Sequence, residues 1–520
     1  MKQTIVVFSD LHYHQEQKAV IPKRRRDLGP LLARRLVERC NRRLRPDLVL
    51  FLGDCLDEPQ GERAPELLRE LRACLDRLKC PWFALPGNHD PAPDAFYAVM
   101  PRPPPSQDLA GLRLLVFDRD GQDARWQATR SDDELARLRA ARADGFRGRV
   151  VAAQHVNVMP SATGHQVAFN YLNADAIGAA ATAAGVDLCI GGHAHVDTDL
   201  RVAGGVSYLG VPALCEAPFA YTVVTLDDSG ISRRVEPLAL PPELALIDTH
   251  SHSQFAYCSE DMHLARNAGV AALFGLRGLV VTEHSGQLYF PAERFWGGAF
   301  CEDGMAGARP ADNRANAYFA GFVAATGELP LWPGLEVDVD YAGKPIMSLA
   351  DRTRATVRLG AVHYLKAMHQ PPETRQEAAF AEFRARTTAL CRSGIHVLAH
   401  PDRVLRAAKL TLPPDFDEWL VKLLRDTRVA AELNFHHSPP TPAFVQRCLE
   451  SKVRLALGSD AHGLWELGEL SHHLALLAEV GVTRELGGVL WQPPAPDLGT
   501  GTIIFTALPP PPATPKPAKP

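Results

Sequence analysis

The chain has 520 residues, of which 46% are hydrophobic and 22% are charged, and its formal net charge at pH 7 is −4. These values exclude a disordered acidic or basic chain, and the length allows roughly two to four domains. The nearly balanced charge gives no electrostatic argument for nucleic-acid binding by the whole chain, although a local basic patch can still bind such a partner.

The first apolar run and the cysteines indicate the compartment. The run Ile5–Phe8 is short and soon meets Asp10, which predicts a first β-strand rather than a signal peptide. No stretch reaches the roughly 18 apolar residues that a membrane span needs. The ten cysteines include no C-x-x-C pair, which argues against a zinc ribbon and a disulfide framework. We therefore expect a soluble, reduced, cytoplasmic protein without membrane association.

Two changes in composition divide the chain. Three prolines interrupt residues 236–250, and a new apolar strand is predicted to begin at Leu244. Residues 509–520 read PPPPATPKPAKP and cannot form a core. We predict two domains, at 1–238 and 243–495, and a Pro-rich disordered tail at 496–520. The tail is either a plain solvated extension or a polyproline segment that docks a partner.

Both domains alternate short apolar runs with helical patterns. The strands predicted in the first domain are Thr4–Phe8, Leu48–Leu52, Trp82–Leu85, Leu112–Phe117, Val150–Ala153 and Leu188–Ile190. Those predicted in the second domain are Leu244–Ile247, Gly278–Val281, Leu335–Val337, Ala361–Val362, Val397–Ala399, Ala430–Leu433 and Arg454–Leu457. The alternation predicts mainly parallel strands, with the functional residues at their carboxyl ends.

Polar residues follow five strands of the first domain. The groups are Asp10-x-His12, Gly53-Asp54, Gly87-Asn88-His89-Asp90, His155, and Gly191-Gly192-His193-Ala194-His195. Carboxylate, imidazole and amide ligands suit a pair of divalent ions such as Mn, Fe or Zn. Two such ions about 3.5–4 Å apart can clamp a phosphate and generate a hydroxide nucleophile.

In type and order, these five groups resemble the calcineurin-like metallophosphoesterases over residues 1 to about 235. The resemblance implies a four-layer β-sandwich of two mixed sheets flanked by helices. One metal ion would be held by Asp10, His12, Asp54 and His195, and a second by Asp54, Asn88, His155 and His193. His89 would contact the phosphate or protonate the leaving group, and Asp90 would orient His89. The segment His155-Val156-Asn157 departs from the His-His-Pro of many relatives.

The segment 18–45 contains eleven basic and two acidic residues. The cluster Lys23–Arg26 follows the first predicted metal loop and could attract a polyanionic substrate. The remaining arginines fit the solvated face of a helix near Leu31–Arg43.

A second series of polar groups follows the strands of the second domain. The groups are Asp248-Thr249-His250-Ser251-His252, Thr282-Glu283-His284, Gly334-Leu335-Glu336, His363, His400-Pro401, Glu432-Leu433-Asn434 and Ser459-Asp460-Ala461-His462. Histidines two apart at a strand end can face one metal ion, because alternate side chains share a side. Further histidines and a bridging glutamate can complete a site of two or three ions.

These groups resemble the PHP family, named for polymerase and histidinol phosphatase domains, over about residues 243–495. The resemblance implies a distorted (β/α)7 barrel with a trinuclear metal centre at the carboxyl face. The implied ligands are His250, His252, His284, Glu336, His363, His400, Asp460 and His462, with Glu336 bridging two ions. The family usually has one more histidine after H-x-H; here Cys258 or Glu260 could replace it, or the site holds two ions. Arg403, Asn434 and His436 are candidates for substrate contact.

The leading hypothesis is a bifunctional metal-dependent phosphoesterase that cleaves phosphodiester or phosphomonoester bonds of a phosphorylated small molecule. It would carry two divalent ions in the first site and two or three in the second, and the second site could resemble that of a histidinol phosphatase. One alternative is a nuclease or nucleic-acid repair phosphodiesterase, which the basic segment supports weakly. Another is a regulatory protein with one inactive half. The physiological substrate, the metal identity and the oligomeric state leave no mark in the sequence.

Overall fold

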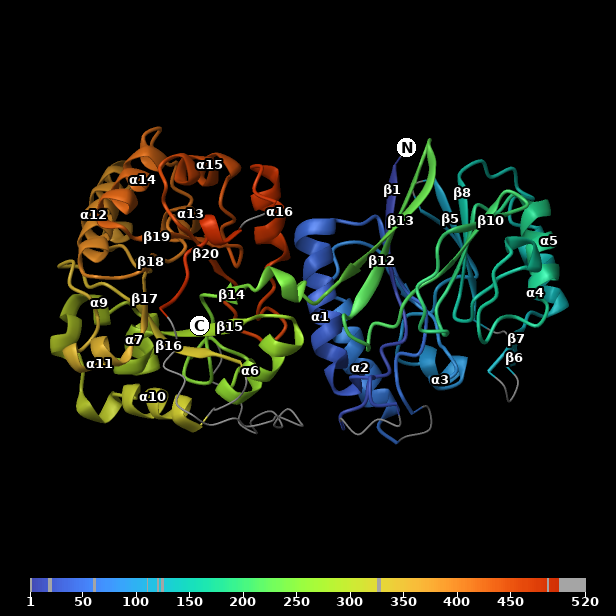
Figure 1. The fold of residues 1–520 in the computed structure, drawn as a ribbon, viewed down its shortest axis with the longest axis horizontal. Helices are drawn as coiled ribbons and strands as arrows, with labels where there is room; N and C mark the ends of the chain where they lie inside the picture. Colours follow the sequence, from blue (N-terminus) through green and yellow to red (C-terminus); the bar gives the residue numbers. More distant parts are fainter. Residues whose placement is uncertain are drawn as a thin grey trace. The chain divides into compact units, whose positions relative to one another are not determined.

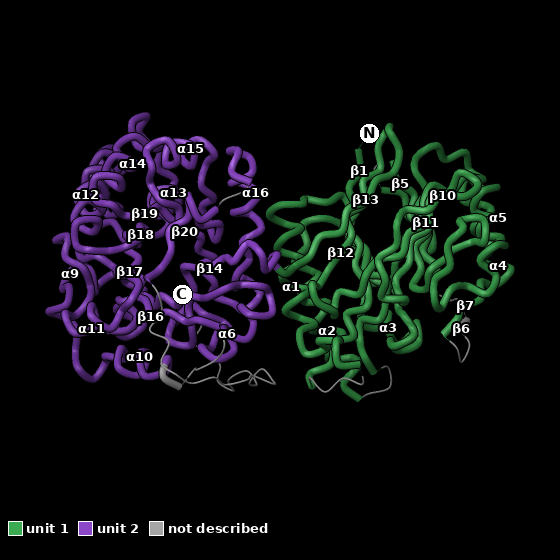
Figure 2. Tube along the Cα trace, viewed as in Figure 1, with its two compact units in different colours: residues 1–239 green, residues 240–520 purple. Residues whose placement is uncertain are grey.

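The computed structural model describes residues 2–16, 21–58, 62–109, 111–118, 121–122, 126–324, 329–483 and 486–494. The chain forms two compact units, residues 1–239 and residues 240–520 (Figure 2). The predicted tail at 496–520 lies outside the described residues. Within the described ranges, no helix combines the length and the apolarity that crossing a bilayer requires.

Unit 1 is mixed α/β and contains two main sheets, each with parallel and antiparallel strand pairs (Figure 1). One sheet has the order β13-β12-β1-β2-β3 and the other the order β10-β11-β9-β8-β5-β4. The strands are β1 (Gln3–Phe8), β2 (Leu48–Phe51), β3 (Trp82–Ala84), β4 (Ser106–Leu109), β5 (Leu112–Phe117), β8 (Arg149–Gln154), β9 (Leu188–Gly191), β10 (Arg201–Ala203), β11 (Val206–Gly210), β12 (Ala220–Asp227) and β13 (Gly230–Pro237). A small third sheet pairs β6 (Gly121–Gln122) with β7 (Ala128–Thr129). The helices are α1 (Gly29–Arg39), α2 (Ala64–Leu75), α3 (Pro93–Tyr97), α4 (Asp132–Arg139) and α5 (Ala174–Ala184).

One apolar core is shared by the two sheets of unit 1. It takes alternate residues of the central strands, because successive side chains of a strand point to opposite faces. Its members include Ile5, Val7, Leu48, Leu50, Leu112, Leu114, Val151, Ala153, Leu188 and Ile190. A second cluster joins the opposite face of the six-stranded sheet to α4 and α5. The parallel strands β1, β2, β8 and β9 are therefore held rigidly, and so are the loops at their carboxyl ends.

Unit 2 contains seven parallel strands that follow one another in chain order around a nearly closed barrel (Figure 1). The strands are β14 (Ile247–Asp248), β15 (Gly278–His284), β16 (Leu331–Val337), β17 (Val357–Gly360), β18 (Val397–Leu398), β19 (Ala430–Asn434) and β20 (Leu455–Gly458). The first and last strands meet where the Thr249 N–H donates to the Leu457 carbonyl (2.9 Å) and Ser251 forms a parallel bridge with Ala461. The helices are α6 (Leu264–Leu273), α7 (Ser285–Tyr289), α8 (Ala292–Trp296), α9 (Phe300–Asp303), α10 (Ala315–Ala324), α11 (Leu349–Arg354), α12 (Pro372–Arg392), α13 (Arg403–Ala407), α14 (Phe416–Thr427), α15 (Pro442–Glu450) and α16 (Ser471–Glu479).

The inside of the barrel changes from apolar to polar along the strands. Trp332 belongs to the apolar cluster of unit 2, and Glu336 lies four residues later on β16. Val280 and His284 have the same relation on β15. Residues four apart on a strand point to the same face. The strand period therefore places an apolar floor under a ring of buried histidines and carboxylates at the carboxyl ends.

Two predicted strands of the second domain are misplaced. Leu244 lies in a 3₁₀ turn, Pro242–Leu244, and β14 begins three residues later, because Pro242 starts a turn of fixed φ. The predicted strand Ala361–Val362 follows β17, which is formed by Val357–Gly360.

The aromatic residues between β15 and β16 are packing residues. Six of them are buried: Tyr289, Phe290, Phe295, Phe300, Tyr318 and Phe319. The Tyr318 hydroxyl reaches the carbonyls of Val281 and Gly334, both at 2.7 Å, and so ties α10 to the barrel strands. Phe295 also contacts the His284 ring, with 5.8 Å between the ring centroids.

Candidate metal centres

Seven of the predicted ligand residues have a positive φ, which non-glycine residues rarely adopt. They are Asp10, His12, Asp54, His193 and His195 in unit 1, with φ between 45° and 65°, and His400 and Asp460 in unit 2, with φ of 28° and 53°. Each follows the end of a β-strand, where the chain turns sharply. Strained backbone of this kind persists where the surroundings over-determine it, and it concentrates at functional sites.

The first group of ligand atoms comes from the ends of β1, β2 and β9. His12 Nε2 lies 3.1 Å from His195 Nε2. Asp10 Oδ1 lies 3.3 Å from the same His195 nitrogen, and Asp54 Oδ2 lies 3.5 Å from His12 Nε2. Asp10, His12 and His195 can thus present one atom each to a single ion.

The second group is adjacent and includes Asp54 again. His155 Nε2 lies 3.0 Å from Asn88 Oδ1 and 3.1 Å from His193 Nδ1. Asp54 Oδ2 lies 3.4 Å from His155 Nε2. The same carboxylate oxygen is therefore within 3.5 Å of a histidine nitrogen in each group. It can bridge two ions.

The hydrogen bonds around these histidines fit a cation between them. His12 Nδ1 faces Asp57 Oδ1 at 3.2 Å, and His195 Nδ1 faces Glu216 Oε1 at 2.7 Å. A carboxylate only accepts hydrogen bonds, so both Nδ1 atoms carry the proton of the neutral ring. The two Nε2 atoms then present lone pairs to each other at 3.1 Å. Such an arrangement needs a proton or a metal ion in the middle.

Metal binding in unit 1 is expected to strengthen as the pH rises from 6 to 9. Burial alone would lower the pKa of His155 and of His195, but the nearby carboxylates Asp54, Asp10 and Glu216 raise both to about 9. Below pH 9 an incoming ion must displace these protons, so its apparent affinity rises about tenfold per pH unit for each proton released. Calorimetric titration with Mn²⁺ in buffers of different ionisation enthalpy measures the proton count. An affinity that is constant across this range would contradict the expectation.

Carboxylates lie behind the histidines; the sequence interpretation missed Asp57, Glu216 and Asp338, whereas Glu432 belongs to one of the predicted polar groups. Asp57 and Glu216 hold His12 and His195 in unit 1. In unit 2, Asp338 Oδ1 lies 2.7 Å from His363 Nδ1, and Glu432 Oε1 lies 2.7 Å from His250 Nδ1. The proximity of Asp57 to Asp54 and of Asp338 to Glu336 in the sequence is the only signal that could have suggested them.

The basic cluster Lys23–Arg26 is engaged with these supporting carboxylates. Lys23 Nζ lies 2.6 Å from Glu216 Oε2, and Arg26 Nη1 lies 2.8 Å from Asp57 Oδ2. Arg24 Nη1 lies 3.4 Å from His12 Nδ1. The cluster therefore acts mainly by neutralising and orienting the supports of the metal centre.

Replacing Glu216 with glutamine is expected to weaken metal binding by unit 1 about 10- to 100-fold, as is typical for partners of ligating histidines. The amide can present its NH₂ group to His195 Nδ1 and so destabilise the ring orientation that aims Nε2 at the ion. Dialysis equilibrium with Mn²⁺ would measure the change. Glu66→Gln is a matched control, because Glu66 is half-exposed and pairs with Arg63; equal affinities in the two variants would rule out the supporting role.

His89 and Asp90 are both at the centre, but they do not form the expected pair. The Asp90 carboxylate accepts the backbone N–H groups of Gly87 (2.9 Å), Cys55 (3.0 Å) and Leu56 (2.9 Å). The His89 ring instead donates from Nδ1 to the Asp57 carbonyl at 2.8 Å. The Asp90 carboxylate therefore holds two loops together and does not hydrogen-bond to the His89 ring directly.

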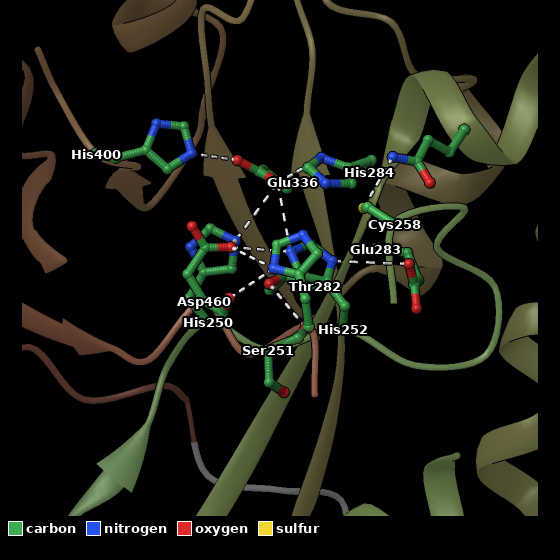
Figure 3. Close-up of polar contacts among 12 residues, drawn as sticks. His250, Ser251, His252, Cys258, Thr282, Glu283, His284, Glu336, His400 and Asp460 are labelled. Atoms are coloured by element: carbon green, nitrogen blue, oxygen red, sulfur yellow. Dashed lines mark hydrogen bonds and ion pairs between the residues drawn. The ribbon is translucent and has the colours of Figure 1, made fainter. Parts of the chain in front are cut away.

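In unit 2, Glu336 lies at the centre of four histidines (Figure 3). Its Oε2 atom lies 2.6 Å from His284 Nδ1 and 3.4 Å from His250 Nε2. Its Oε1 atom lies 2.6 Å from His400 Nε2 and 3.1 Å from His363 Nε2. The two oxygens thus face two different pairs of histidines, as a bridging carboxylate does.

A second carboxylate, Asp460, connects this cluster to two more histidines. Asp460 Oδ1 lies 3.4 Å from His250 Nε2 and 3.1 Å from His252 Nε2. His462 Nδ1 lies 3.7 Å from the same oxygen. His252, His284 and His462 can present one atom each to a further ion.

Several buried atoms of this cluster lie close to one another but form no well-aligned hydrogen bond among the described residues. They are His250 Nε2, His252 Nδ1, Glu283 Oε2, His284 Nδ1, Glu336 Oε2 and His363 Nε2. Buried polar atoms are nearly always satisfied, so a convergent set of this kind calls for a bound ion. The donor set of imidazole and carboxylate suits Mn, Fe or Zn.

Cys258 and Glu260, the two candidates for an extra ligand, lie in different environments. The Cys258 thiol is buried and accepts a hydrogen bond from Gln287 Nε2 at 3.4 Å. Burial would raise its pKa, but His462 and His284 beside it lower the pKa well below its usual range. The Glu260 side chain is exposed, and this residue reaches the site through its backbone N–H, which donates to the His462 carbonyl at 2.7 Å.

The three predicted substrate-contact residues gather around Asp460 and His462. Arg403 Nη2 contacts Asp460 Oδ2 and donates to Asn434 Oδ1 at 3.1 Å. Asn434 Nδ2 donates to Asp460 Oδ2 at 3.2 Å. The His436 ring stacks on the His462 ring with 4.9 Å between centroids. One guanidinium and one amide therefore lie at the edge of the histidine cluster.

Comparison with known proteins identifies the first domain. Residues 3–197 match the family model of the calcineurin-like phosphoesterases. No curated protein matches the chain in sequence. Similar solved structures include a dimetal phosphatase from Danio rerio, with 16% identity over 45% of this chain and 96% of that chain and a TM-score of 0.38. A candidate histidinol phosphatase from Listeria monocytogenes has 14% identity over 43% of this chain and 97% of that chain, with a TM-score of 0.29. A purple acid phosphatase from yellow lupin (Lupinus luteus) seeds has 13% identity over 46% of this chain and 52% of that chain, with a TM-score of 0.32.

The family match and the clusters of candidate ligands define a metal-dependent phosphoric ester hydrolase. Its residues 3–197 form a calcineurin-like metallophosphoesterase domain, a class that works with divalent metal ions.

Proposed function

We propose that the protein is a bifunctional phosphoesterase with one hydrolytic centre in each unit. The observation that carries the proposal is that each unit gathers histidines around a shared carboxylate, Asp54 in unit 1 and Glu336 in unit 2. The boundary after residue 239 supports the predicted domain limits 1–238 and 243–495. In this proposal unit 2 is a PHP-type barrel.

The unit 1 centre holds two divalent ions. Asp10, His12, Asp54 and His195 bind the first ion, and Asp54, Asn88, His155 and His193 bind the second. Ions held by these ligands supply positive charge against the phosphate and an activated water as nucleophile.

The residues of unit 1 that act on the substrate follow from the hydrogen bonds. His89 donates its Nδ1–H to the Asp57 carbonyl, which leaves Nε2 as the ring atom available to the substrate; the imidazolium form of His89 gives its Nε2 proton to the leaving-group oxygen and keeps the Nδ1 proton. The Asp54 Oδ1 atom accepts the His89 backbone N–H at 2.8 Å and thereby sets the position of the ring relative to the bridging carboxylate. Asp90 positions the loops that carry Asp54 and His89.

The unit 2 centre is proposed to hold three ions. Glu336 bridges two of them, which His250, His363, His400 and Asp460 also bind. The third position is formed by His252, His284, His462 and the Cys258 thiolate. Arg403 and Asn434 orient the phosphate at its edge, and His436 supports His462.

Cys258→Ser is expected to remove one metal equivalent from unit 2 and to shift the third position from Zn²⁺ toward Mn²⁺. The thiolate is a soft ligand that favours zinc, and the hydroxyl of serine is a poor replacement. Elemental analysis after loading with each metal measures the count. Cys301→Ser is a matched control because Cys301 is also buried but contacts the Val339 carbonyl. Unchanged zinc content in the Cys258 variant would show that the thiolate is not a metal ligand.

The bifunctional proposal is tested by hydrolysis of a generic phosphodiester and a generic phosphomonoester with added Mn²⁺. Asp10→Asn and Asp460→Asn each remove one carboxylate ligand, from unit 1 and unit 2 respectively. We expect each variant to lose one activity and to keep the other. If Asp460→Asn changes neither activity, unit 2 is not a general phosphoesterase, and the proposal is reduced to unit 1.

The proposed substrates are phosphorylated small molecules rather than nucleic acids. The Lys23–Arg26 charges, which belong to the basic segment that supports a nuclease weakly, are paired with acidic residues. Phosphate-driven nucleic-acid binding would weaken steeply with salt. DNA binding that falls steeply between 50 and 200 mM salt would favour the nuclease instead.

A further inference from the structure

Two exposed aromatic side chains stand at the unit 1 centre without a role in the metal chemistry. Trp126 is 49% exposed and Phe169 is 41% exposed. They are the aromatic members of the large exposed hydrophobic side chains found in the described residues. Exposed aromatic surface is unfavourable in water, so its presence beside a polar site calls for an explanation.

Both rings contact histidines of the centre. The Trp126 ring is stacked over the His89 ring, with 6.0 Å between centroids and 18° between planes. The Phe169 ring meets the His193 ring edge to face at 5.4 Å. The Trp126 carbonyl also accepts from His193 Nε2 at 2.9 Å. The two aromatic rings are therefore positioned by His89, which is assigned to the phosphate ester, and by His193, which is assigned to the second ion.

The two rings occupy equivalent positions on paired segments of chain. Ala128 and Tyr171 form a parallel β-bridge, and the Leu172 N–H donates to the Ala128 carbonyl at 2.8 Å. Trp126 and Phe169 each lie two residues before the bridge. The bridge therefore ties together the two segments that carry the rings.

The backbone at both positions is strained. Trp126 has φ of 62° and Phe169 has φ of 58°, a region that bulky side chains rarely adopt. The strain resembles that of the ligand residues His193 and His195 in the same unit. Two strained aromatic residues at paired positions indicate that their exposure is maintained for a purpose.

A cavity lies beside the second ion position of unit 1. It has a volume of about 230 Å³ and is lined by Asn88 and His155 of the metal centre. Ala128 and Tyr171, which each follow an exposed ring by two residues, line it as well. The cavity therefore joins the second ion position to the segments that carry the aromatic pair.

We propose that Trp126 and Phe169 form a binding subsite for a planar aromatic group attached to the phosphate ester that unit 1 hydrolyses. Stacking on two aromatic faces recognises such a group through its π surface, which aryl esters and nucleotides share. The subsite gives unit 1 a preference for aromatic over aliphatic esters. This inference rests on the proposed hydrolytic function of the unit 1 centre.

The test compares phosphorus compounds that differ in their organic group. Phenylphosphonate, methylphosphonate and adenosine 5′-phosphate are used as competitive inhibitors of the diester hydrolysis that Asp10→Asn abolishes. We expect phenylphosphonate and adenosine 5′-phosphate to have inhibition constants about 10- to 100-fold below that of methylphosphonate. In Trp126→Leu and Phe169→Leu, which keep the apolar bulk and remove the ring, this ratio falls toward one. Phe169→Tyr restores it, and the exposed control Val202→Ala keeps the wild-type ratio.

The outcomes separate the subsite from the hydrolytic function. Equal inhibition by phenylphosphonate and methylphosphonate in the wild type overturns the subsite while leaving hydrolysis intact. The subsite is also overturned if the ratio of inhibition constants keeps its wild-type value in both Trp126→Leu and Phe169→Leu while the metal content is unchanged. If no diester is hydrolysed, the proposed function fails, and calorimetric binding of the two phosphonates to the metal-loaded full chain decides on the subsite. An advantage for phenylphosphonate alone identifies aryl esters, whereas tighter binding of adenosine 5′-phosphate identifies a nucleotide.

Discussion

Asp54→Asn is expected to remove both metal ions from unit 1 and to reduce its phosphoesterase activity at least about 1000-fold, or about 4 kcal/mol of transition-state stabilisation. Asp54 Oδ2 lies 3.5 Å from His12 Nε2 and 3.4 Å from His155 Nε2, so one oxygen serves both ion positions. An asparagine can offer one neutral oxygen at most, and it places an NH₂ group where the other carboxylate oxygen was. The residue is 2% exposed and has no room to reorient.

The measurement pairs elemental analysis with initial rates for a generic diester. Asp94→Asn is the matched control, because the Asp94 side chain is 99% exposed and pairs with Arg102. The control should keep both ions and the full rate. An Asp54 variant that retains two ions in unit 1 would show that this carboxylate does not bridge them.

Glu336→Gln is expected to empty the two bridged positions of unit 2 and to destabilise the metal-free barrel by about 3 kcal/mol. The carboxylate is fully buried and faces His250, His284, His363 and His400. Removing one partner of a buried charged cluster leaves the others uncompensated, which is costly in a medium of low dielectric constant. The metal content of unit 1 should not change.

The pH dependence of the metal-free protein provides a second readout of the same variant. Burial would lower the pKa of His363, but Glu336 and Asp338 raise it to about 9. A histidine whose pKa is higher in the folded state contributes stability below its unfolded value near 6.5, and that contribution is lost as the pH rises through 9. Calorimetric unfolding in chelator should show this loss in the wild type and a smaller one in Glu336→Gln. Glu302→Gln, at a half-exposed site that pairs with Lys366, is the control and should match the wild type. If the pH profile of Glu336→Gln is identical to that of the wild type, Glu336 does not control the protonation of the histidine cluster.

The clustering of the candidate ligands could be predicted from the sequence because these residues lie at or near the carboxyl ends of strands. His155, Asp460 and the other predicted ligands follow buried strands, and the period of two in a strand fixes which side chains face the carboxyl edge. The family model independently covers residues 3–197. The parallel pairing of unit 2 was predicted because its strands alternate with helical segments, whereas the barrel was implied by the resemblance to the PHP family.

What the sequence could not predict depends on contacts between distant segments. Glu216 lies 21 residues after His195, and no spacing rule connects a carboxylate to the imidazole that it supports. The segments that carry Trp126 and Phe169 are joined by the β-bridge between Ala128 and Tyr171, which lie 43 residues apart in the sequence. Asp90 follows His89 directly in the sequence, which suggested a contact between the two side chains. The Asp90 carboxylate instead accepts hydrogen bonds from backbone N–H groups.

The seam of the barrel has a further consequence for chain entropy. The first and last strands of unit 2 meet beside His250, His252, Asp460 and His462, and the His252 Nε2 to Asp460 Oδ1 contact of 3.1 Å spans 208 residues of sequence. A cation held by ligands on both sides is therefore a removable cross-link that ties the two ends of the barrel together. A permanent link closing a loop of this length would stabilise the fold by about 5 kcal/mol on the chain-entropy model. Chelation should thus open the barrel at this seam first, so that amide hydrogen exchange accelerates in β14 and β20 before it does in β16 and β17.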